Sequence, residues 1–399
     1  MDRLTQRRRR ALYVLFFLPG LAIASWVTRT PSIRDLLGAS TAEMGVVLFG
    51  LSVGSMAGIL GSGPLVARFG ARPVIIVGTV GVVASMPVIG LGGALASSPL
   101  VAAGLCLFGL GMGGGEVALN IEGADVERII GRAVLPTMHG FFSLGTTIGA
   151  MLGIGFTAAD FPVAWHLLGV GVVALSAFAV VAGRLPSGVG KQPKRSRAER
   201  AGSPKPGVWR DSRLALIGVI VLAMALAEGT ANDWLPLVMV DGHGFVPALG
   251  SAIYAVFAAS MTVGRFVGGF FLERAGRAAV VRASALAGTL GLALVIFVDN
   301  QVAAGAAVVL WGLGTSLGFP VALSAAGDSG ENPAARVSLV ATAGYCAFLV
   351  GPPVLGFLGE EFGLRNALIV VLGFVALAAV LAPAVAKRER SAPERVRAG

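Results

Sequence analysis

Two short stretches of the chain place a glutamate four residues ahead of an asparagine within otherwise apolar runs. They read EVALN at 116–120 and EGTAN at 228–232. In an α-helix, residues i and i+4 lie one above the other on the same face. Glu116 with Asn120, and Glu228 with Asn232, would therefore each form one polar patch. A carboxylate in such a patch takes up a proton when it is desolvated and releases it when water or a cation reaches it.

The composition indicates that both runs lie in a membrane. The 399-residue chain is 55% hydrophobic and only 13% charged, with a mean hydropathy of +0.83, whereas a water-soluble domain needs about a quarter of its residues charged. Crossing the hydrocarbon core takes about 20 apolar residues in a helix. We predict twelve spans, at 11–29, 43–62, 73–93, 99–121, 134–157, 162–183, 213–234, 248–270, 278–298, 301–325, 336–358 and 365–385. The 58 glycines fit close helix contacts, as in the series Gly50, Gly54 and Gly58.

A carboxylate at mid-membrane is unfavourable by about 2.5–3.5 kcal/mol on insertion scales. It is tolerated where it faces a water-filled cavity or has a partner. One interpretation makes Glu116 and Glu228 proton-coupling groups in a cavity, and the other makes them structural carboxylates bonded to a neighbouring helix. Asp233 follows the second patch where its span ends, and it is either a cavity residue or a solvated gate residue.

The net charge of +10 is explained by membrane topology rather than by nucleic-acid binding. Of the 31 Lys and Arg residues, only Arg29, Arg34 and Arg365 fall in the loops of one side, and Arg265 falls within a span. Positive loops stay in the cytoplasm, so both termini are predicted to be cytoplasmic in an inner-membrane, multi-pass protein. The N-terminal segment is interpreted as an uncleaved first span because its orientation is needed by the spans that follow.

The chain divides into two similar halves. Residues 1–10 form a basic cytoplasmic N-terminus, 11–183 a first six-helix bundle, 184–212 a cytoplasmic linker, 213–385 a second six-helix bundle and 386–399 a basic tail. The stretch GPLVARFGAR at 63–72 matches GFFLERAGRA at 269–278, at an offset of 206 residues. Two such bundles around a central cavity are typical of transporters that work by alternating access.

On these motifs the sequence resembles the major facilitator superfamily over nearly its full length. In the family, the loop between the second and third spans forms a conformational gate, and an acid in it joins a cytoplasmic charge network. Ala67 stands where that acid is usual, whereas the second copy has Glu273. The resemblance assigns the gate loops to Gly63, Arg68, Gly70 and Arg72, and to Gly269, Glu273, Arg274, Gly276 and Arg277. Leu65 also fits the first copy.

Within the superfamily, EVALN is similar to a stretch of fucose permease-type proton symporters. Glu116 and Asn120 match the glutamate and asparagine of that stretch, and Ile121 replaces its proline. The acid that those symporters carry near the end of the first span is missing from ASWVTRTP at 24–31. In the family, spans one, four, seven and ten line the cavity, which implies that both polar patches face the solute.

Further cavity candidates are single polar or aromatic residues within or near the spans. Several also have a structural interpretation: interfacial anchoring for Trp26, a loop charge for Arg29 and a hydrogen-bonded structural role for the histidine. Each tyrosine needs a polar partner or a cavity for its hydroxyl. These candidates are Trp26, Arg29, His139, Tyr254, Trp311 and Tyr345. Arg265 is expected to pair with Glu273 or to extend toward the interface.

These observations predict an all-α polytopic membrane protein with twelve helices in two pseudo-symmetric bundles. We expect that it is not an enzyme. The first functional hypothesis is proton-coupled symport of a small polar organic solute, sugar-like in the first instance. Symport is favoured because the stretch HGFFSLGTTIGAMLG at 139–153 of the fifth span has glycines but no proline of the kind that many antiporters of the superfamily carry. The alternatives are a proton-coupled exporter of amphipathic drugs or metabolites, and a sensor or scaffold that does not transport. Expected partners are the solute, protons and the lipid bilayer, with no cofactor beyond the proton gradient, no metal and no nucleic acid, and with a functional monomer.

Overall fold

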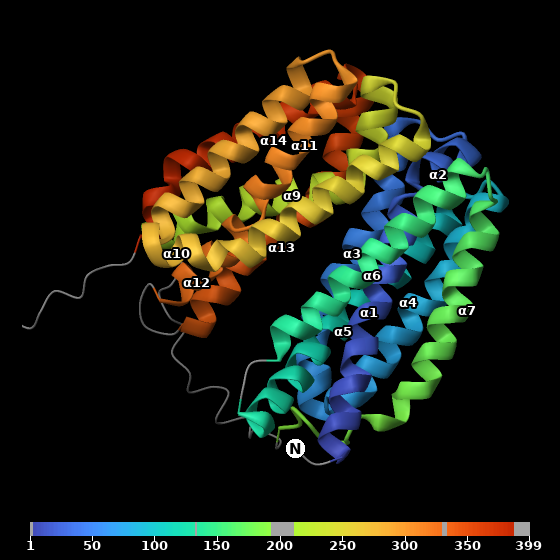
Figure 1. The fold of residues 1–399 in the computed structure, drawn as a ribbon, viewed down its shortest axis with the longest axis vertical. Coiled ribbons are helices and arrows are strands. Elements are labelled where there is room, and N and C mark those ends of the chain that lie inside the picture. Colours follow the sequence, from blue (N-terminus) through green and yellow to red (C-terminus); the bar gives the residue numbers. More distant parts are fainter. Residues whose placement is uncertain (1–2, 132–133, 193–210, 329–332, 387–399) are drawn as a thin grey trace, which may run out of the picture.

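The computed structural model describes residues 3–131, 134–192, 211–328 and 333–386. Within these ranges all regular structure is helical and no strand occurs. The helices form two groups that lie side by side (Figure 1). The first bundle contains α1 (Arg3–Val27), α2 (Thr30–Leu37), α3 (Thr41–Phe69), α4 (Ala71–Ala94), α5 (Ser98–Ile130), α6 (Leu135–Ala158), α7 (Val163–Val181) and the 3-10 turn η1 (Ala182–Arg184). The second contains α9 (Ser212–His243), α10 (Pro247–Phe297), α11 (Gln301–Thr315), α12 (Gly318–Gly327), α13 (Pro333–Phe362), α14 (Leu364–Leu381) and the 3-10 turn η3 (Ala382–Val385).

The described residues include eleven segments that are long and apolar enough to cross a membrane. One of them, α10, is 51 residues long and contains the predicted eighth and ninth spans, which meet at Gly276. The twelve-helix prediction is therefore confirmed. Gly276 has φ 76° and ψ 168°, and its counterpart Gly70, between α3 and α4, has φ 89° and ψ 168°. Side chains disfavour positive φ, so the repeated glycine makes the same sharp turn in each half.

The predicted tenth span is interrupted between α11 and α12. The ring of a proline clashes with the carbonyl of the residue four positions earlier. Pro320 is four residues after Ser316, and α11 ends at Thr315. The break thus follows from the sequence, although our prediction of an unbroken span at 301–325 missed it.

Close contacts between α3 and α5 depend on small residues, as the sequence predicted. A Cβ on Gly54 would lie 2.0 Å from the Cys106 carbonyl oxygen, and one on Gly50 would lie 2.4 Å from that of Ala102. A Cβ on Gly58 would lie 2.5 Å from the Leu110 carbonyl oxygen. No larger side chain fits at these three positions, so the glycines let α3 and α5 approach each other closely.

Two segments outside the predicted spans have defined structure. The basic N-terminus is helical from Arg3 onward, because α1 begins there. The first part of the expected linker is ordered, since Gln192 N donates to the Ala67 carbonyl and Ala71 N donates to that of Val189. Most of the linker and of the C-terminal tail lies outside the described residues.

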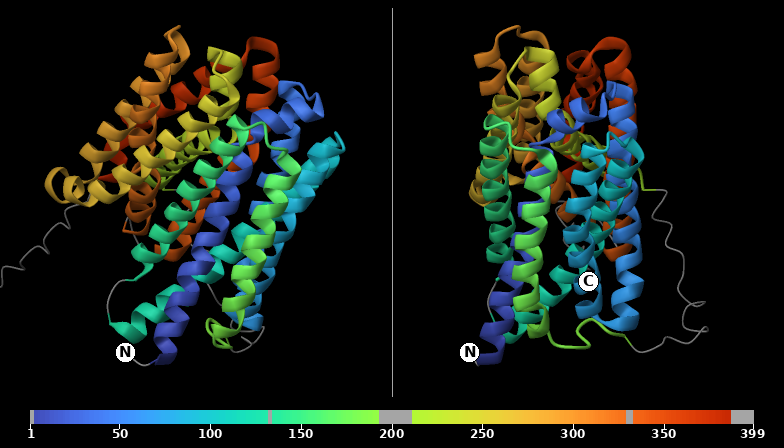
Figure 2. Two further views of the ribbon diagram at one scale, coloured as in Figure 1. Left: turned by 45° about the vertical axis from the view of Figure 1, so that its right-hand side comes forward. Right: turned by 90° about the vertical axis from the view of Figure 1, so that its right-hand side faces the viewer.

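The two bundles meet near α2 and diverge toward the end of the molecule that carries the N-terminus (Figures 1 and 2). We call these the α2 end and the N-terminus end. Ser251 Oγ on α10 donates to the Thr28 carbonyl at 2.6 Å, and Ser52 Oγ on α3 donates to that of Phe348 on α13 at 2.6 Å. Arg34 on α2 pairs with Asp241 on α9. These contacts between the bundles all lie in the half of the molecule nearer α2.

Candidate functional site

An ion pair inside the second bundle is the centre of the candidate site. Arg265 Nη2 on α10 lies 3.0 Å from Glu228 Oε1 on α9. The Arg265 side chain is 47% exposed, whereas that of Glu228 is 17% exposed. The expectation that Arg265 pairs with Glu273 or extends to the interface is wrong. Arg265 lies well before the turn at Gly276, so its side chain reaches α9, while Glu273 is exposed and has no ion pair among the described residues.

Glu116 faces this pair from the other bundle. It lies on α5, its side chain is exposed, and the charges that act on it are those of Arg265 and Glu228. No hydrogen bond or ion pair joins Glu116 to another described residue. An acid that is accessible and also feels the charges of the opposite bundle must border an open space between the two. One guanidinium here faces two carboxylates and is bonded to only one of them.

The amide of the first polar patch contacts the predicted histidine. Asn120 Oδ1 on α5 lies 3.0 Å from His139 Nε2 on α6. The His139 ring is exposed, packs edge-on against Phe16 at 5.0 Å, and is acted on by the charge of Arg265. Glu116, Asn120 and His139 therefore form the part of the site that the first bundle supplies.

The two predicted tyrosines border the site from the second bundle. The Tyr254 hydroxyl on α10 donates to Asn232 Oδ1 on α9 at 3.4 Å, and Tyr254 is buried. Tyr345 on α13 is half-buried and lies within electrostatic range of Glu116. With Glu228 and Arg265, these residues give the second bundle a polar surface opposite that of the first.

Three of the predicted cavity residues lie elsewhere. Trp26 and Trp311 are buried inside their bundles, where they pack edge-on against Phe108 and Phe257 at 6.3 Å and 5.7 Å. Large apolar rings fill helix interfaces, so neither indole is available to stack on a solute or to anchor the protein at a membrane interface. Arg29 is buried near the α2 end and donates to Thr157 Oγ1 at 2.9 Å.

Asp233 is not a solvated gate residue. It is buried at 7% exposure on α9, in a seam between α9 and α13. Among the described residues no hydrogen bond or ion pair involves its carboxylate. Although it adjoins Asn232 in the sequence, it points into the second bundle.

The predicted gate loops make contacts within their own bundles. Arg68 stacks over Phe69 at 4.9 Å, and Arg274 over Phe270 at 3.9 Å. Arg277 pairs with Asp328 Oδ2 at 2.6 Å and donates to Ser324 Oγ at 3.0 Å. Arg72 is half-buried, and the other loop glycines, Gly63 and Gly269, are exposed. No ion pair crosses between the bundles from these loops among the described residues.

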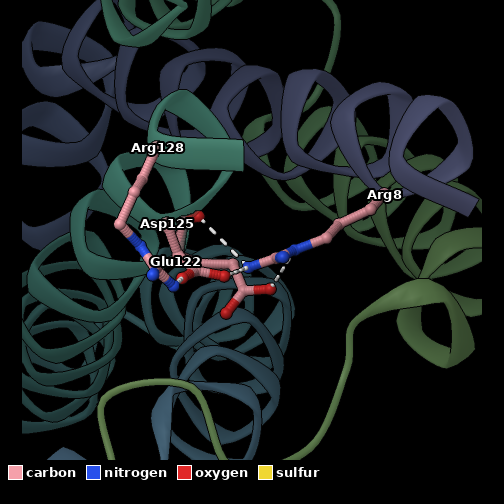
Figure 3. Close-up of polar contacts among 4 residues, drawn as sticks. All are labelled: Arg8, Glu122, Asp125 and Arg128. Atoms are coloured by element: carbon pink, nitrogen blue, oxygen red, sulfur yellow. Dashed lines mark hydrogen bonds and ion pairs between the residues drawn. The ribbon is translucent and has the colours of Figure 1, made fainter. Parts of the chain in front are cut away.

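A buried charge cluster at the N-terminus end is absent from the sequence prediction (Figure 3). Arg8 on α1 lies 2.7 Å from Glu122 Oε1 and 2.8 Å from Asp125 Oδ2, both on α5. Arg128 bonds the other oxygen of Asp125 at 2.6 Å. The Arg8 side chain is 9% exposed and that of Glu122 is 0% exposed. The sequence prediction treats Arg8 only as a topology signal, although the close spacing of Glu122 and Asp125 beyond an apolar run is a usable sign.

Comparisons with known proteins agree with this architecture. Residues 12–336 match the family model of the Major Facilitator Superfamily. An MFS-type transporter of Yersinia pestis is 31% identical over 371 residues, which cover 91% of this chain and 90% of that protein. A transporter of Sinorhizobium fredii is 30% identical, with 92% and 95% covered. Membrane protein MosC of Rhizobium meliloti is 24% identical, with 90% and 85% covered.

Two solved structures share the fold. A mutant form of the nucleoside transporter NupG superposes with a TM-score of 0.77 at 18% identity, covering 95% of this chain and 100% of that one. A bacterial homologue of the human lysosomal transporter Spinster, in an inward-facing and unoccupied conformation, gives a TM-score of 0.69 at 16% identity, covering 96% and 98%.

Proposed function

This chain belongs to the Major Facilitator Superfamily and is a multi-pass membrane transporter rather than an enzyme, and we propose that it couples the movement of a small polar organic solute to protons by alternating access. The observation that carries the proposal is the unequal charge of the site. Arg265 neutralises Glu228, and no other cation among the described residues pairs with Glu116. A carboxylate next to low-dielectric protein is stabilised by a counter-charge, and a proton is the simplest one.

The proposed roles of the three charged residues follow from their positions. Glu116 on the first bundle takes up and releases the coupled proton, because it is exposed and unpaired. Arg265 and Glu228 on the second bundle hold each other until the solute or Glu116 competes for the guanidinium. Since Glu116 and Arg265 belong to different bundles, their separation changes when the bundles rock. This gives the proton a direct effect on the conformational equilibrium.

The proposed orientation rests on the basic residues. We place the N-terminus end in the cytoplasm because nearly all Lys and Arg residues fall in loops on that side. The hydrogen bonds at the α2 end and the exposed Glu116 then correspond to a state that is closed to the outside and open to the cytoplasm. On this proposal the protein lies in the inner membrane with both termini inside and acts as a monomer.

A neutral polar solute fits the site best. Asn120, His139, Asn232 and the two tyrosines supply hydrogen-bond donors and acceptors on both walls, while proton uptake by Glu116 brings the three charged groups to balance. The similarity of EVALN to fucose permease-type symporters favours a sugar-like compound, and the fold shared with NupG adds nucleosides as probes. These are the first classes that we would examine.

Export of an amphipathic cation is the second candidate. The unpaired Glu116 and the nearby Tyr345 would suit a positively charged, partly aromatic solute that competes with the proton for one site. In that case solute and proton would move in opposite directions. A sensor role would leave binding intact without any flux.

Uptake into proteoliposomes tests the proposal. Purified protein is reconstituted in one orientation, a pH gradient is imposed with the acid side outside, and uptake of radiolabelled sugars, nucleosides and cationic amphiphiles is measured. The proposal expects one neutral class to accumulate above its external concentration, and to equilibrate only when a protonophore is added. Accumulation of cations with the gradient reversed would favour export, and binding without flux would favour a sensor.

A further inference from the structure

Asp233 is a buried acid for which the transport site described above has no use. Its carboxylate makes no hydrogen bond or ion pair with the described residues, and it is 7% exposed. Beside it on α9, Thr230 Oγ1 and Trp234 Nε1 are also buried without partners. The unpaired carboxylate and these two buried atoms lie in one seam, which is exceptional because buried polar groups are nearly always bonded.

Within the part of the chain that the structure describes, no positive charge compensates this carboxylate. The side chains that reach the seam from α13 are apolar, namely Ala347, Phe348, Pro352 and Leu355. From α10 the only titratable group nearby is the Tyr254 phenol, and along α9 it is Glu228, which is itself paired with Arg265. Among the described residues, burial alone, and no charged side chain, acts on Asp233. An ionised carboxylate here would be strongly unfavourable.

The seam also leaves little room for another counter-ion. The gaps between the atoms that line the seam are too narrow to admit a water molecule. A hydrated cation is larger than a water molecule, whereas a proton occupies no space. The carboxyl form of Asp233 fits the closed seam without any rearrangement.

The seam is covered by the contact that closes the α2 end. Phe348 lines the seam, and its carbonyl accepts the hydrogen bond from Ser52 of the first bundle. One turn further along α13, the Pro352 carbonyl oxygen and Gly356 meet Gly45, where an added Cβ would lie 2.9 Å from either. Parting of the bundles at this end would therefore uncover α13 directly over Asp233.

We propose that Asp233 is a second proton-binding site, reached from the α2 side, whose protonation permits that end of the transporter to close. In the closed state the acid is neutral and buried. When α3 leaves α13, water reaches the carboxyl group, which releases its proton to that side and then resists closure. The closed state binds the proton more tightly than the open state, so acidification of the α2 side favours closure.

This inference rests on the proposed alternating-access cycle, but its test needs no solute and no proton flux. Spin labels are attached at Leu36→Cys on α2 and Glu361→Cys on α13, after Cys106 and Cys346 are replaced by alanine. These exposed positions lie in different bundles at the α2 end. Pulsed electron paramagnetic resonance on the full-length protein in nanodiscs then measures the distance between the two labels from pH 8 to pH 5. A short distance reports closure of the α2 end, and a long distance reports its opening.

We expect the short-distance population to grow on acidification, with the ratio of the two populations changing up to tenfold per pH unit, as one proton requires. Asp233→Asn, which resembles the neutral acid, should have a larger short-distance population than the wild type at every pH. Any pH response that it retains should disappear when Glu116→Gln is added, whereas Glu116→Gln alone should keep a pH response. Thr230→Ala, which enlarges the seam, should move the midpoint to lower pH and serves as a second variant if Asp233→Asn does not fold.

Three results would overturn the assignment. The first is a wild-type distribution that does not respond to pH, and the second is an unchanged response in Asp233→Asn. The third is a response that follows sodium concentration at fixed pH, which would make the seam a cation site. Loss of the response in Glu116→Gln alone would contradict the role of Asp233 while leaving the proposed function intact.

Discussion

Arg265 bonds Glu228 of its own bundle at 3.0 Å, while Glu116 of the other bundle is within electrostatic range of both and is bonded to neither. Glu116 lies on one side of the interface between the bundles, and the ion pair lies on the other, so their separation changes when the bundles move. A single guanidinium shared unequally between two carboxylates leaves one acid free to carry a proton. The proposed coupling of solute to protons depends on this unequal sharing.

Glu116→Gln should abolish proton-driven accumulation but retain exchange of solute across the membrane. The amide keeps the shape and hydrogen bonding of the side chain and cannot be ionised. Uphill uptake should therefore fall at least tenfold, to the level of equilibration, while exchange of labelled for unlabelled solute continues. Glu361→Gln, at an exposed position on α13, is the matched control and should transport normally. Normal uphill uptake by Glu116→Gln would remove this acid from the mechanism.

Arg265 and Glu228 should show strong energetic coupling. Arg265→Gln leaves a mostly buried carboxylate without its partner, which lowers stability, and the double variant with Glu228→Gln should recover most of that loss. Neighbouring charges typically couple by about 0.5–3 kcal/mol. Thermal unfolding of the two single variants and the double variant in detergent measures the coupling. Additive effects would mean that the pair contributes nothing to the folded state.

Gly45→Val should favour the conformation that is open at the α2 end. A Cβ at Gly45 would lie 2.9 Å from Gly356 Cα, so a larger side chain must separate α3 from α13. Labelling of a cysteine in the seam by a reagent added on that side should become faster. Gly61→Val is the control, because an added Cβ there meets only Leu65 Cδ1, at 3.9 Å. Equal labelling rates in the two variants would contradict the proposed closure.

The Arg8 cluster should stabilise the first bundle. Removing one partner of a buried ion pair destabilises a protein by about 3–5 kcal/mol, whereas replacing both with apolar residues is often neutral. Arg8→Met should therefore lower the melting temperature more than Arg8→Met combined with Glu122→Met. Exposed Arg3 supplies the control variant Arg3→Met. If the double variant is no more stable than Arg8→Met, the pair has a role beyond charge compensation.

The N-terminus of α9 should respond to pH through Asp211. The Arg336 guanidinium, which donates to this carboxylate, holds the pKa of Asp211 below its ordinary value. A lowered pKa stabilises the folded state above the unfolded pKa, which is about 4, and this contribution is lost as the pH falls through the folded-state pKa. Asp211→Asn retains the side-chain oxygen that accepts from Leu214 N but loses the ion pair with Arg336. The free energy of unfolding at pH 7 should therefore fall by only about 0.2–1 kcal/mol.

The check on Asp211 is the melting temperature of both proteins between pH 7 and pH 3. The difference should begin to shrink below about pH 4, the unfolded-state pKa, and should shrink further as the pH falls through the lower folded-state pKa, where the native carboxylate takes up a proton. A difference that stays constant over the whole range would exclude an ionic contribution from this residue.

The fold could be predicted because membrane constraints are strong. Apolar length defined the spans, and the matched Gly70 and Gly276 marked the repeat, because both positions need a conformation that favours glycine. The interruption before Pro320 was missed, although the proline itself indicates it. The polar patches were found from i, i+4 spacing alone, since charge within an apolar run is costly.

The partners of the charged residues could not be predicted in the same way. Arg265 was expected to turn toward Glu273, but the pair with Glu228 depends on how α9 and α10 are rotated against each other. Trp26 and Trp311 were expected in the cavity but are buried inside their bundles. Composition does not reveal which side of a helix faces the bundle interior. Asp233 differs from Asn232 by one position, and that single step takes its side chain from the site into the seam.

The most direct test of the central claim is the luminal pH of proteoliposomes that contain a pH-sensitive dye and oriented protein. A solute is added outside with no gradient imposed. We predict that the transported solute acidifies the lumen in the wild type and leaves the pH unchanged in Glu116→Gln, although the solute still enters. Alkalinisation of the lumen would replace symport with exchange. Solute entry without any pH change in the wild type would contradict proton coupling altogether.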